Sequence, residues 1–144
     1  MFSKTAQYTF RILIFMSQEA SSLFSATRIH EQTEIPYKYL TMLLTKLAKA
    51  DILKATRGRN GGFLLNKDIE DIYLINILDA IDENNCSNCA LGEDACNEEF
   101  PCSLHESYVL PKIALVEMLN TTSLSKLDPS LMQSHASAMK KSNP

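Results

Sequence analysis

Three of the four glycines in this 144-residue chain lie in one short stretch, residues 57–62 (Arg-Gly-Arg-Asn-Gly-Gly). Glycine adopts positive φ without the steric penalty of a side chain, so the stretch suits the tip of a tight hairpin. The runs on either side, residues 52–56 and 63–65, suit its two strands. The chain therefore contains a small β-hairpin, and the segments before it are interpreted in that context.

Three helices are expected before the hairpin. Ser3 and Ser25 are suitable N-caps for the first and second helices, and Pro36 fits the first turn of the third, where its missing N–H is not needed. The third helix should end near Ala50. Two short helices joined by a tight turn and followed by a hairpin predict a winged helix-turn-helix. Apolar residues recur at helical spacing along the first and third helices: Ala6, Phe10, Leu13 and Ile14, then Leu40, Leu43, Leu44 and Leu47.

The second half should be helical around a loop. A fourth helix is expected from about Ile72 to near Asp82, and a long last helix from Pro101, which Pro111 should kink or delay. The last helix follows a complete small domain. Its apolar face is therefore more suited to a dimer interface than to the core of the same chain. The expected fold class is mainly α with a small β-hairpin. The expected domains are a winged helix-turn-helix (1–67), a cluster-binding loop with dimerisation helices (68–127) and a flexible tail (128–144).

Charge is distributed unevenly along the chain. The net charge is −3, yet residues 1–67 hold ten Lys and Arg against four Asp and Glu (net +6), whereas residues 68–144 hold four against thirteen (net −9). A basic first half followed by an acidic second half fits a DNA-binding module joined to a control module, although solvated helix faces explain the charges about as well. No apolar run is long enough to span a membrane and no signal-peptide pattern is present, so we expect a cytoplasmic protein with no membrane partner.

A DNA-reading surface follows from the winged helix-turn-helix. A recognition helix presents its N-terminal residues to the major groove, and a basic wing tip suits the minor groove. Lys38 can reach a phosphate or a guanine, Thr41 a base or a thymine methyl, and Met42 offers apolar contact. Two arginines on a tight glycine turn have little packing purpose, which favours DNA contact there. The candidate DNA-binding residues are Ser25, Tyr37, Lys38, Thr41, Met42, Arg57, Gly58 and Arg59.

All four cysteines fall within 17 residues, at positions 86, 89, 96 and 102, and His105 follows. Core cysteines are normally scattered, so this crowding indicates a metal or iron–sulfur site or a thiol switch. If the last helix begins at Pro101, Cys102 and His105 lie one turn apart on one face. Ligand type alone leaves iron–sulfur, zinc and thiol-switch chemistry open. Nearby acidic residues should raise the pKa of the thiols in the metal-free protein and disfavour a lone reactive thiolate: Glu93, Asp94, Glu98 and Glu99.

Residues 35–50 and 56–63, with the N-terminal run 2–8, resemble the IscR/NsrR family of bacterial winged-helix regulators, and the resemblance spans roughly residues 1–125. It implies a homodimer in which the long C-terminal helix pairs with its mate. It also implies an iron–sulfur cluster, with 2Fe–2S favoured and 4Fe–4S as the alternative. The implied ligands are Cys89, Cys96, Cys102 and His105.

The chain departs from the IscR-like pattern at several positions. Six residues separate Cys89 from Cys96 where five are usual, and Cys86 is an additional cysteine that can replace any one of the other three. The NsrR-like fourth ligand is an N-terminal carboxylate, and the matching residue here is Gln7, a poor ligand for iron. Thr41 and Met42 stand where the cluster-assembly regulator has polar base-reading residues, so its operator preference does not transfer.

The sequence thus predicts a homodimeric transcription regulator that binds a double-stranded DNA operator under the control of an iron–sulfur cluster, sensing redox state, iron or nitric oxide. The alternative is an iron–sulfur electron-transfer or cluster-carrier protein without sequence-specific DNA binding, against which the basic wing argues. An enzyme is not expected, because no Ser/His/Asp or paired-carboxylate arrangement suggests catalysis.

Overall fold

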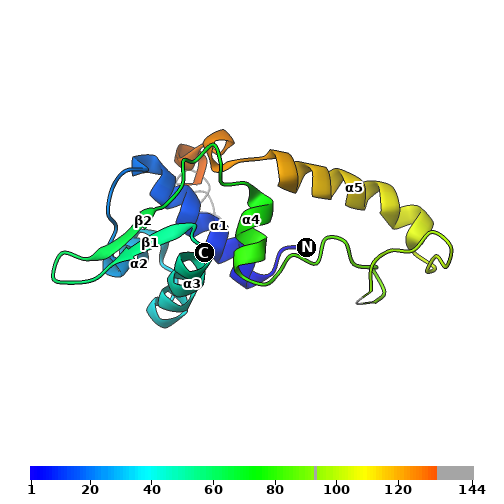
Figure 1. The fold of residues 1–144 in the computed structure, drawn as a ribbon, viewed down its shortest axis with the longest axis horizontal. Coiled ribbons are helices and arrows are strands. Elements are labelled where there is room, and N and C mark those ends of the chain that lie inside the picture. The colour runs from blue at the N-terminus through cyan, green and yellow to red at the C-terminus, as the bar shows by residue number, and fades with distance from the viewer. Residues whose placement is uncertain (93, 133–144) are drawn as a thin grey trace, which may run out of the picture.

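A computed structural model of the chain describes residues 1–92 and 94–132. A compact helical body carries the hairpin at one end, and the long helix α5 projects from the other (Figure 1). The expected fold class, mainly α with a small antiparallel hairpin, is confirmed. In chain order the elements are α1 (Lys4–Met16), η1 (Ser17–Glu19), α2 (Ala26–Thr33), α3 (Tyr37–Lys49), β1 (Leu53–Thr56), β2 (Gly62–Leu65), α4 (Leu74–Ala80), α5 (His105–Thr121) and η2 (Leu124–Lys126).

The first three helices begin and end close to where the sequence predicts. The Ser3 hydroxyl accepts the backbone N–H of Ala6, and the Ser25 hydroxyl accepts that of Arg28, so both serines cap their helices. Glu34 ends α2 in the left-handed conformation, and Pro36 is the N-cap of α3. The four leucines on the inner face of α3 are completely buried, and they anchor this helix in the core: Leu40, Leu43, Leu44 and Leu47.

The hairpin is joined to the segment before α2 by a β-bridge. Strands β1 and β2 pair from Leu53 opposite Leu65 to Thr56 opposite Gly62. Phe24 and Phe63 then exchange two backbone hydrogen bonds, each 2.8 Å long. Because Phe24 directly precedes the N-cap of α2, this bridge fixes the hairpin against the helix-turn-helix.

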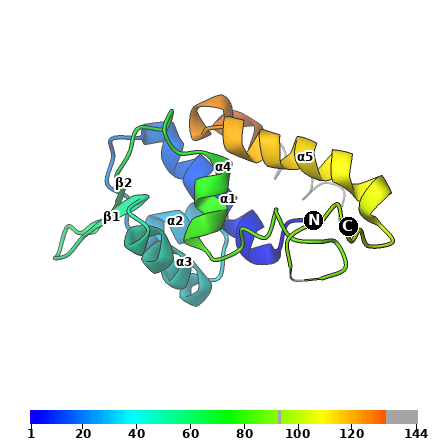
Figure 2. The ribbon, with the colours of Figure 1, turned by 45° about the vertical axis from the view of Figure 1, so that its right-hand side comes forward.

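Helix α5 is anchored to the helical body near its C-terminal end. Leu124 N–H donates to the carbonyl of Ile72, and Leu74 N–H donates to that of Thr122, so the chain after α5 pairs with the start of α4. Leu119 is the one residue of α5 that is fully buried. The other end of the helix reaches away from the body (Figure 2).

Two boundaries differ from the sequence prediction. The prediction that the last helix begins at Pro101 is wrong: Leu104 is the N-cap, and the N–H of His105 donates to the Cys102 carbonyl in a three-residue turn at 3.0 Å. Cys102 therefore precedes the helix. Helix α5 continues through Pro111. Helix α4 is shorter than expected, although the flanking Ile72 and Ile81 are buried with it.

The C-terminal tail was predicted to be flexible, and its residues 133–144 lie outside the described part of the chain. Among the described residues, no helix is both long and apolar enough to cross a membrane.

Candidate functional site

The N-terminal part of α3 is exposed, as a recognition helix requires. Tyr37 and Met42 keep 49% and 43% of their surface accessible, and Lys38 is also exposed. Thr41 is half-buried, and its hydroxyl donates to the Lys38 carbonyl at 3.0 Å. The hydroxyl proton is thus used within α3 in this conformation, while the oxygen can accept a hydrogen bond, and the contact of Thr41 with a base or a thymine methyl stays a prediction.

Two side chains outside α3 hold the turn that precedes it. His30 Nδ1 donates to the Ile35 carbonyl at 2.6 Å, and its ring packs edge-to-face against Tyr37 with centroids 5.7 Å apart. Arg11 donates to the Thr33 carbonyl at 2.7 Å. These contacts orient the start of the candidate recognition helix, and neither could be found from spacing along the chain.

The tip of the hairpin is basic and open to solvent. Arg57, Gly58 and Arg59 are exposed, and so is Lys54 on β1. Gly58 adopts φ +114°, which an L side chain rarely reaches, so glycine is required at this turn. The N–H of Gly61 closes the turn by donating to the Gly58 carbonyl. The tip thus holds its two guanidinium groups on a narrow support suitable for a DNA groove.

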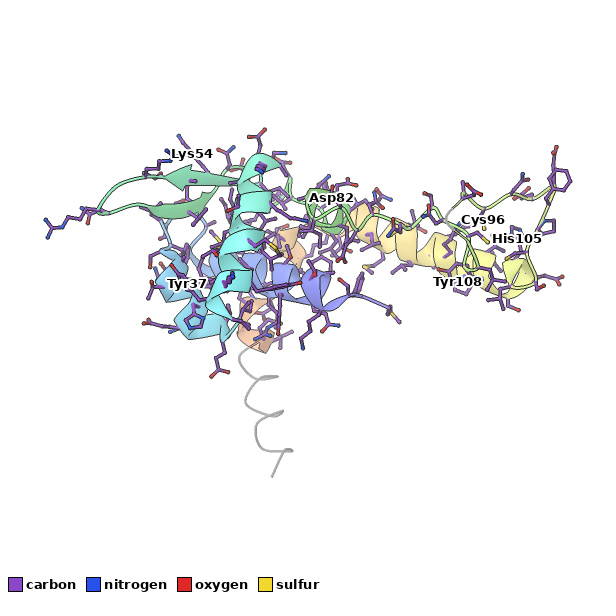
Figure 3. All side chains as sticks on the ribbon, turned by 90° about the horizontal axis from the view of Figure 1, so that it is seen from below. Tyr37, Lys54, Asp82, Cys96, His105 and Tyr108 are labelled. Carbon is purple, nitrogen blue, oxygen red and sulfur yellow. The ribbon has the colours of Figure 1, made fainter. Side chains whose placement is uncertain are left out.

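The predicted ligands meet at the far end of the molecule. Cys89, Cys96, Cys102 and His105 all line one cavity of about 490 Å³. Cys96 Sγ lies 3.7 Å from His105 Nδ1, and the Cys102 thiol is among the groups that lower the pKa of Cys89. Figure 3 shows Cys96 and His105 side by side near the start of α5, distant from Tyr37 on α3. Cys96 and His105 therefore form an adjacent pair, and Cys89 and Cys102 line the same cavity.

Backbone hydrogen bonds fold the cysteine loop into a small hairpin-like turn. Asn88 and Ala95 form an antiparallel bridge. The N–H of Cys89 donates to the Asp94 carbonyl at 2.7 Å, and the N–H of Cys96 donates to the Ser87 carbonyl at 3.3 Å. Cys89 and Cys96 thus line the same cavity although six residues separate them.

The expectation that acidic neighbours raise the thiol pKa values is wrong for Cys89. Its pKa is lowered, first by a backbone hydrogen bond from Leu91, then by the Cys102 thiol, with a smaller contribution from the Lys112 ammonium. Burial does raise the pKa of Cys86, and the Asp79 carboxylate adds to this. For Cys89, the hydrogen-bond donors therefore outweigh the burial that would raise the pKa.

The four candidate ligands are not arranged around a single ion. Within residues 1–92 and 94–132, no three Cys, His, Asp or Glu side chains converge closely enough to hold a single ion. All four thiols are free of disulfides. Three thiols and one imidazole around one cavity match the ligand types of iron–sulfur clusters.

Two other residues singled out in the sequence lie apart from this cavity. Cys86 packs against the core and does not line the cavity; it lines a neighbouring groove, which shares Ala95 and Cys96 with the cavity. Gln7 donates its amide to the Phe2 carbonyl at 2.9 Å. Sequence reasoning missed Lys112, whose Nζ donates to the Ser87 carbonyl at 3.1 Å.

A helix-turn-helix with an exposed, basic, glycine-tipped hairpin defines the class: this is a winged-helix DNA-binding protein. The chain belongs to the Rrf2 family, described as iron-dependent transcriptional regulators, whose family model matches residues 2–128. The resemblance found in the sequence is thereby confirmed, and the protein is a DNA-binding transcriptional regulator.

Individual relatives agree with this assignment. The chain is 31% identical over 103 residues to an HTH-type transcriptional regulator of Haemophilus influenzae, covering 72% of this chain and 69% of that protein. It is 28% identical over 99 residues to the HTH-type transcriptional regulator IscR of Sodalis glossinidius, covering 69% of this chain but only 60% of that protein. These relatives are regulators, which confirms the expectation that the chain is not an enzyme.

Solved structures show the same fold at lower identity. CymR (YrzC), the global cysteine regulator of B. subtilis, superposes with a TM-score of 0.76 at 22% identity, covering 89% of this chain and 95% of that one. The IscR of T. potens superposes with a TM-score of 0.67 at 23% identity, covering 94% and 88%.

Proposed function

We propose that this regulator binds operator DNA under the control of an iron–sulfur cluster held by Cys89, Cys96, Cys102 and His105. One observation carries the proposal: a loop and the start of α5 bring all four side chains to one cavity. The description of the family as iron-dependent and the naming of relatives as IscR support it.

The pairing of the ligands favours a 2Fe–2S cluster over a 4Fe–4S cluster. A two-iron cluster takes two protein ligands at each iron. Cys96 and His105 form one such pair, 3.7 Å apart, which leaves Cys89 and Cys102 for the other iron. Such a cluster supplies one-electron chemistry, and its loss or oxidation is a signal of redox state, iron or nitric oxide.

The signal must travel a long way to reach DNA, because Cys96 and His105 lie at the projecting end of α5, distant from Tyr37 on the candidate recognition helix (Figure 3). Ligands from the loop and from the start of α5 tie these two segments together. An ordered loop then holds α5, and in a homodimer α5 sets the spacing and tilt of the two recognition helices. Loss of the cluster releases the loop and shifts the population of DNA-competent dimers.

The homodimer in this mechanism is supported by the surface of α5. Its apolar side chains have little to pack against within one chain: Leu110 is 73% exposed and Ile113 54% exposed. Exposed apolar stripes of this kind are typical of subunit interfaces. Sedimentation of the purified protein should therefore give twice the mass of one chain.

A thiol switch is the second candidate function. The lowered pKa of Cys89, to which the Cys102 thiol contributes, favours it. A thiolate beside a second thiol can form a disulfide when a peroxide accepts the two electrons that are released. A cluster carrier is less favoured, because the basic wing and exposed α3 have no use in such a protein.

Anaerobic purification tests the proposal. We expect a coloured protein with charge-transfer absorption and about two iron and two sulfide per chain. The His105→Ala variant should lose the cluster, whereas Cys86→Ala, the matched control outside the cavity, should keep it. Colourless protein that contains stoichiometric zinc, or that forms a Cys89–Cys102 disulfide without ever binding iron, would contradict the cluster. DNA binding that is identical with and without the cluster would contradict the proposal that the cluster regulates DNA binding.

A further inference from the structure

Lys112 is a single basic residue within an acidic part of the sequence. It is the only Lys or Arg between Lys67 and Lys126, in a stretch that holds most of the acidic residues of the chain. It lies on α5, two turns after His105, and is half-buried. A single cation in so acidic a region is expected to have a specific partner.

That partner is the backbone of the cysteine loop. Lys112 Nζ donates to the Ser87 carbonyl at 3.1 Å, across 25 residues of chain. The same carbonyl accepts the N–H of Cys96 at 3.3 Å. One carbonyl oxygen therefore connects α5, the segment before Cys89 and the backbone of Cys96.

Lys112 supports the candidate ligands without being one of them. It lines the groove beside Cys86 and Ile113, whereas the cavity that holds the four candidate ligands does not include it. Its contact is with the backbone, because the Ser87 carbonyl that it reaches also accepts the N–H of Cys96.

We propose that Lys112 is a positioning residue for the cysteine site: it fastens the loop that carries Cys89 and Cys96 to α5 through the Ser87 carbonyl. This inference rests on the proposed function, because it assumes that these thiols hold a cluster. Lys112 then provides a direct connection between the cluster loop and the helix that projects from the body.

The test compares Lys112→Met, which removes both the charge and the donor, with Lys112→Arg, which keeps both. Lys126→Met is the matched control, since Lys126 also donates to a backbone carbonyl, that of Thr121 at 2.9 Å, at the other end of α5. Each variant is reconstituted anaerobically with ferrous iron and sulfide. The rate of iron release to an excess of chelator is then followed by absorbance.

We expect Lys112→Met to release iron at least about tenfold faster than the unmodified protein, as loss of residues that support metal ligands commonly does. Lys112→Arg should restore most of the retention, and Lys126→Met should behave like the unmodified protein. In the cluster-free protein, the Cys96 amide of Lys112→Met should exchange with deuterium faster, with circular dichroism unchanged.

Equal iron release and equal exchange in Lys112→Met and the unmodified protein would overturn the inference. Failure of the unmodified protein to acquire any cluster is a different result, because it refutes the proposed function. In that case the exchange of the Cys96 amide decides by itself whether Lys112 fastens the loop. Equal exchange in Lys112→Met and the unmodified protein overturns the inference, and faster exchange in Lys112→Met supports it.

Discussion

Gly62 should be essential for the attachment of the wing, residues 53–65, to the helix-turn-helix. A Cβ at this position would lie 2.5 Å from the Phe24 carbonyl oxygen and 2.9 Å from its carbonyl carbon. Both atoms belong to the backbone, so no side-chain rotation relieves the contact. The Phe24–Phe63 bridge must open in the Gly62→Ala variant.

The expected loss follows from the bonds in the bridge. Two hydrogen bonds of 2.8 Å join Phe24 and Phe63, and each contributes about 1 kcal/mol net. We therefore expect Gly62→Ala to lower the free energy of unfolding by about 2 kcal/mol. With a urea dependence of about 2 kcal/mol per molar, the midpoint of urea unfolding should fall by about 1 M.

Equilibrium urea unfolding of the cluster-free protein, followed by circular dichroism at one protein concentration, measures this change. Gly92→Ala is the matched control, since a Cβ there has no atom within 4 Å, and its effect should stay within about 0.5 kcal/mol. A midpoint for Gly62→Ala equal to that of Gly92→Ala would refute the reasoning, because the wing would then not depend on this close approach. Operator affinity should fall as well, since Ser25 directly follows Phe24.

Three further predictions concern the DNA-binding half and Cys86. Arg59→Ala should weaken operator binding about tenfold in fluorescence anisotropy and reduce the dependence of affinity on salt; unchanged binding would remove the wing tip from the reading surface. Ser25→Ala removes the cap on the Arg28 N–H and should lower the free energy of unfolding by about 1 kcal/mol, whereas Ser22→Ala, outside the helix, should have little effect. The pKa of Cys86 is raised by burial and by Asp79, so the folded state holds this proton more tightly than the unfolded chain. Its contribution to stability is present below about pH 9 and is lost at higher pH. The difference in urea midpoint between the unmodified protein and Cys86→Ala should therefore shrink from pH 8 to pH 10, and a constant difference would contradict the raised pKa.

Much of the fold could be predicted because its signals are local. Ser3 and Ser25 cap helices through bonds to residues three positions away, and Gly58 marks a turn through its own φ. The boundary of α5 was harder to place. Pro101 is compatible with a helix start, but the chain from Cys102 to His105 adopts a turn first, and nothing in the local sequence distinguishes the two.

The sequence by itself determined the winged helix-turn-helix, its basic tip and the set of thiol and imidazole side chains, because short-range spacing, capping and glycine turns encode these features. Only the tertiary structure decided how they relate. The Phe24–Phe63 bridge, the pairing of Cys96 with His105 and the contact of Lys112 with Ser87 join residues 9 to 39 positions apart. Such contacts depend on how whole elements pack, so the lowered pKa of Cys89 and the separation of Cys86 from the cavity became visible only when the chain was folded.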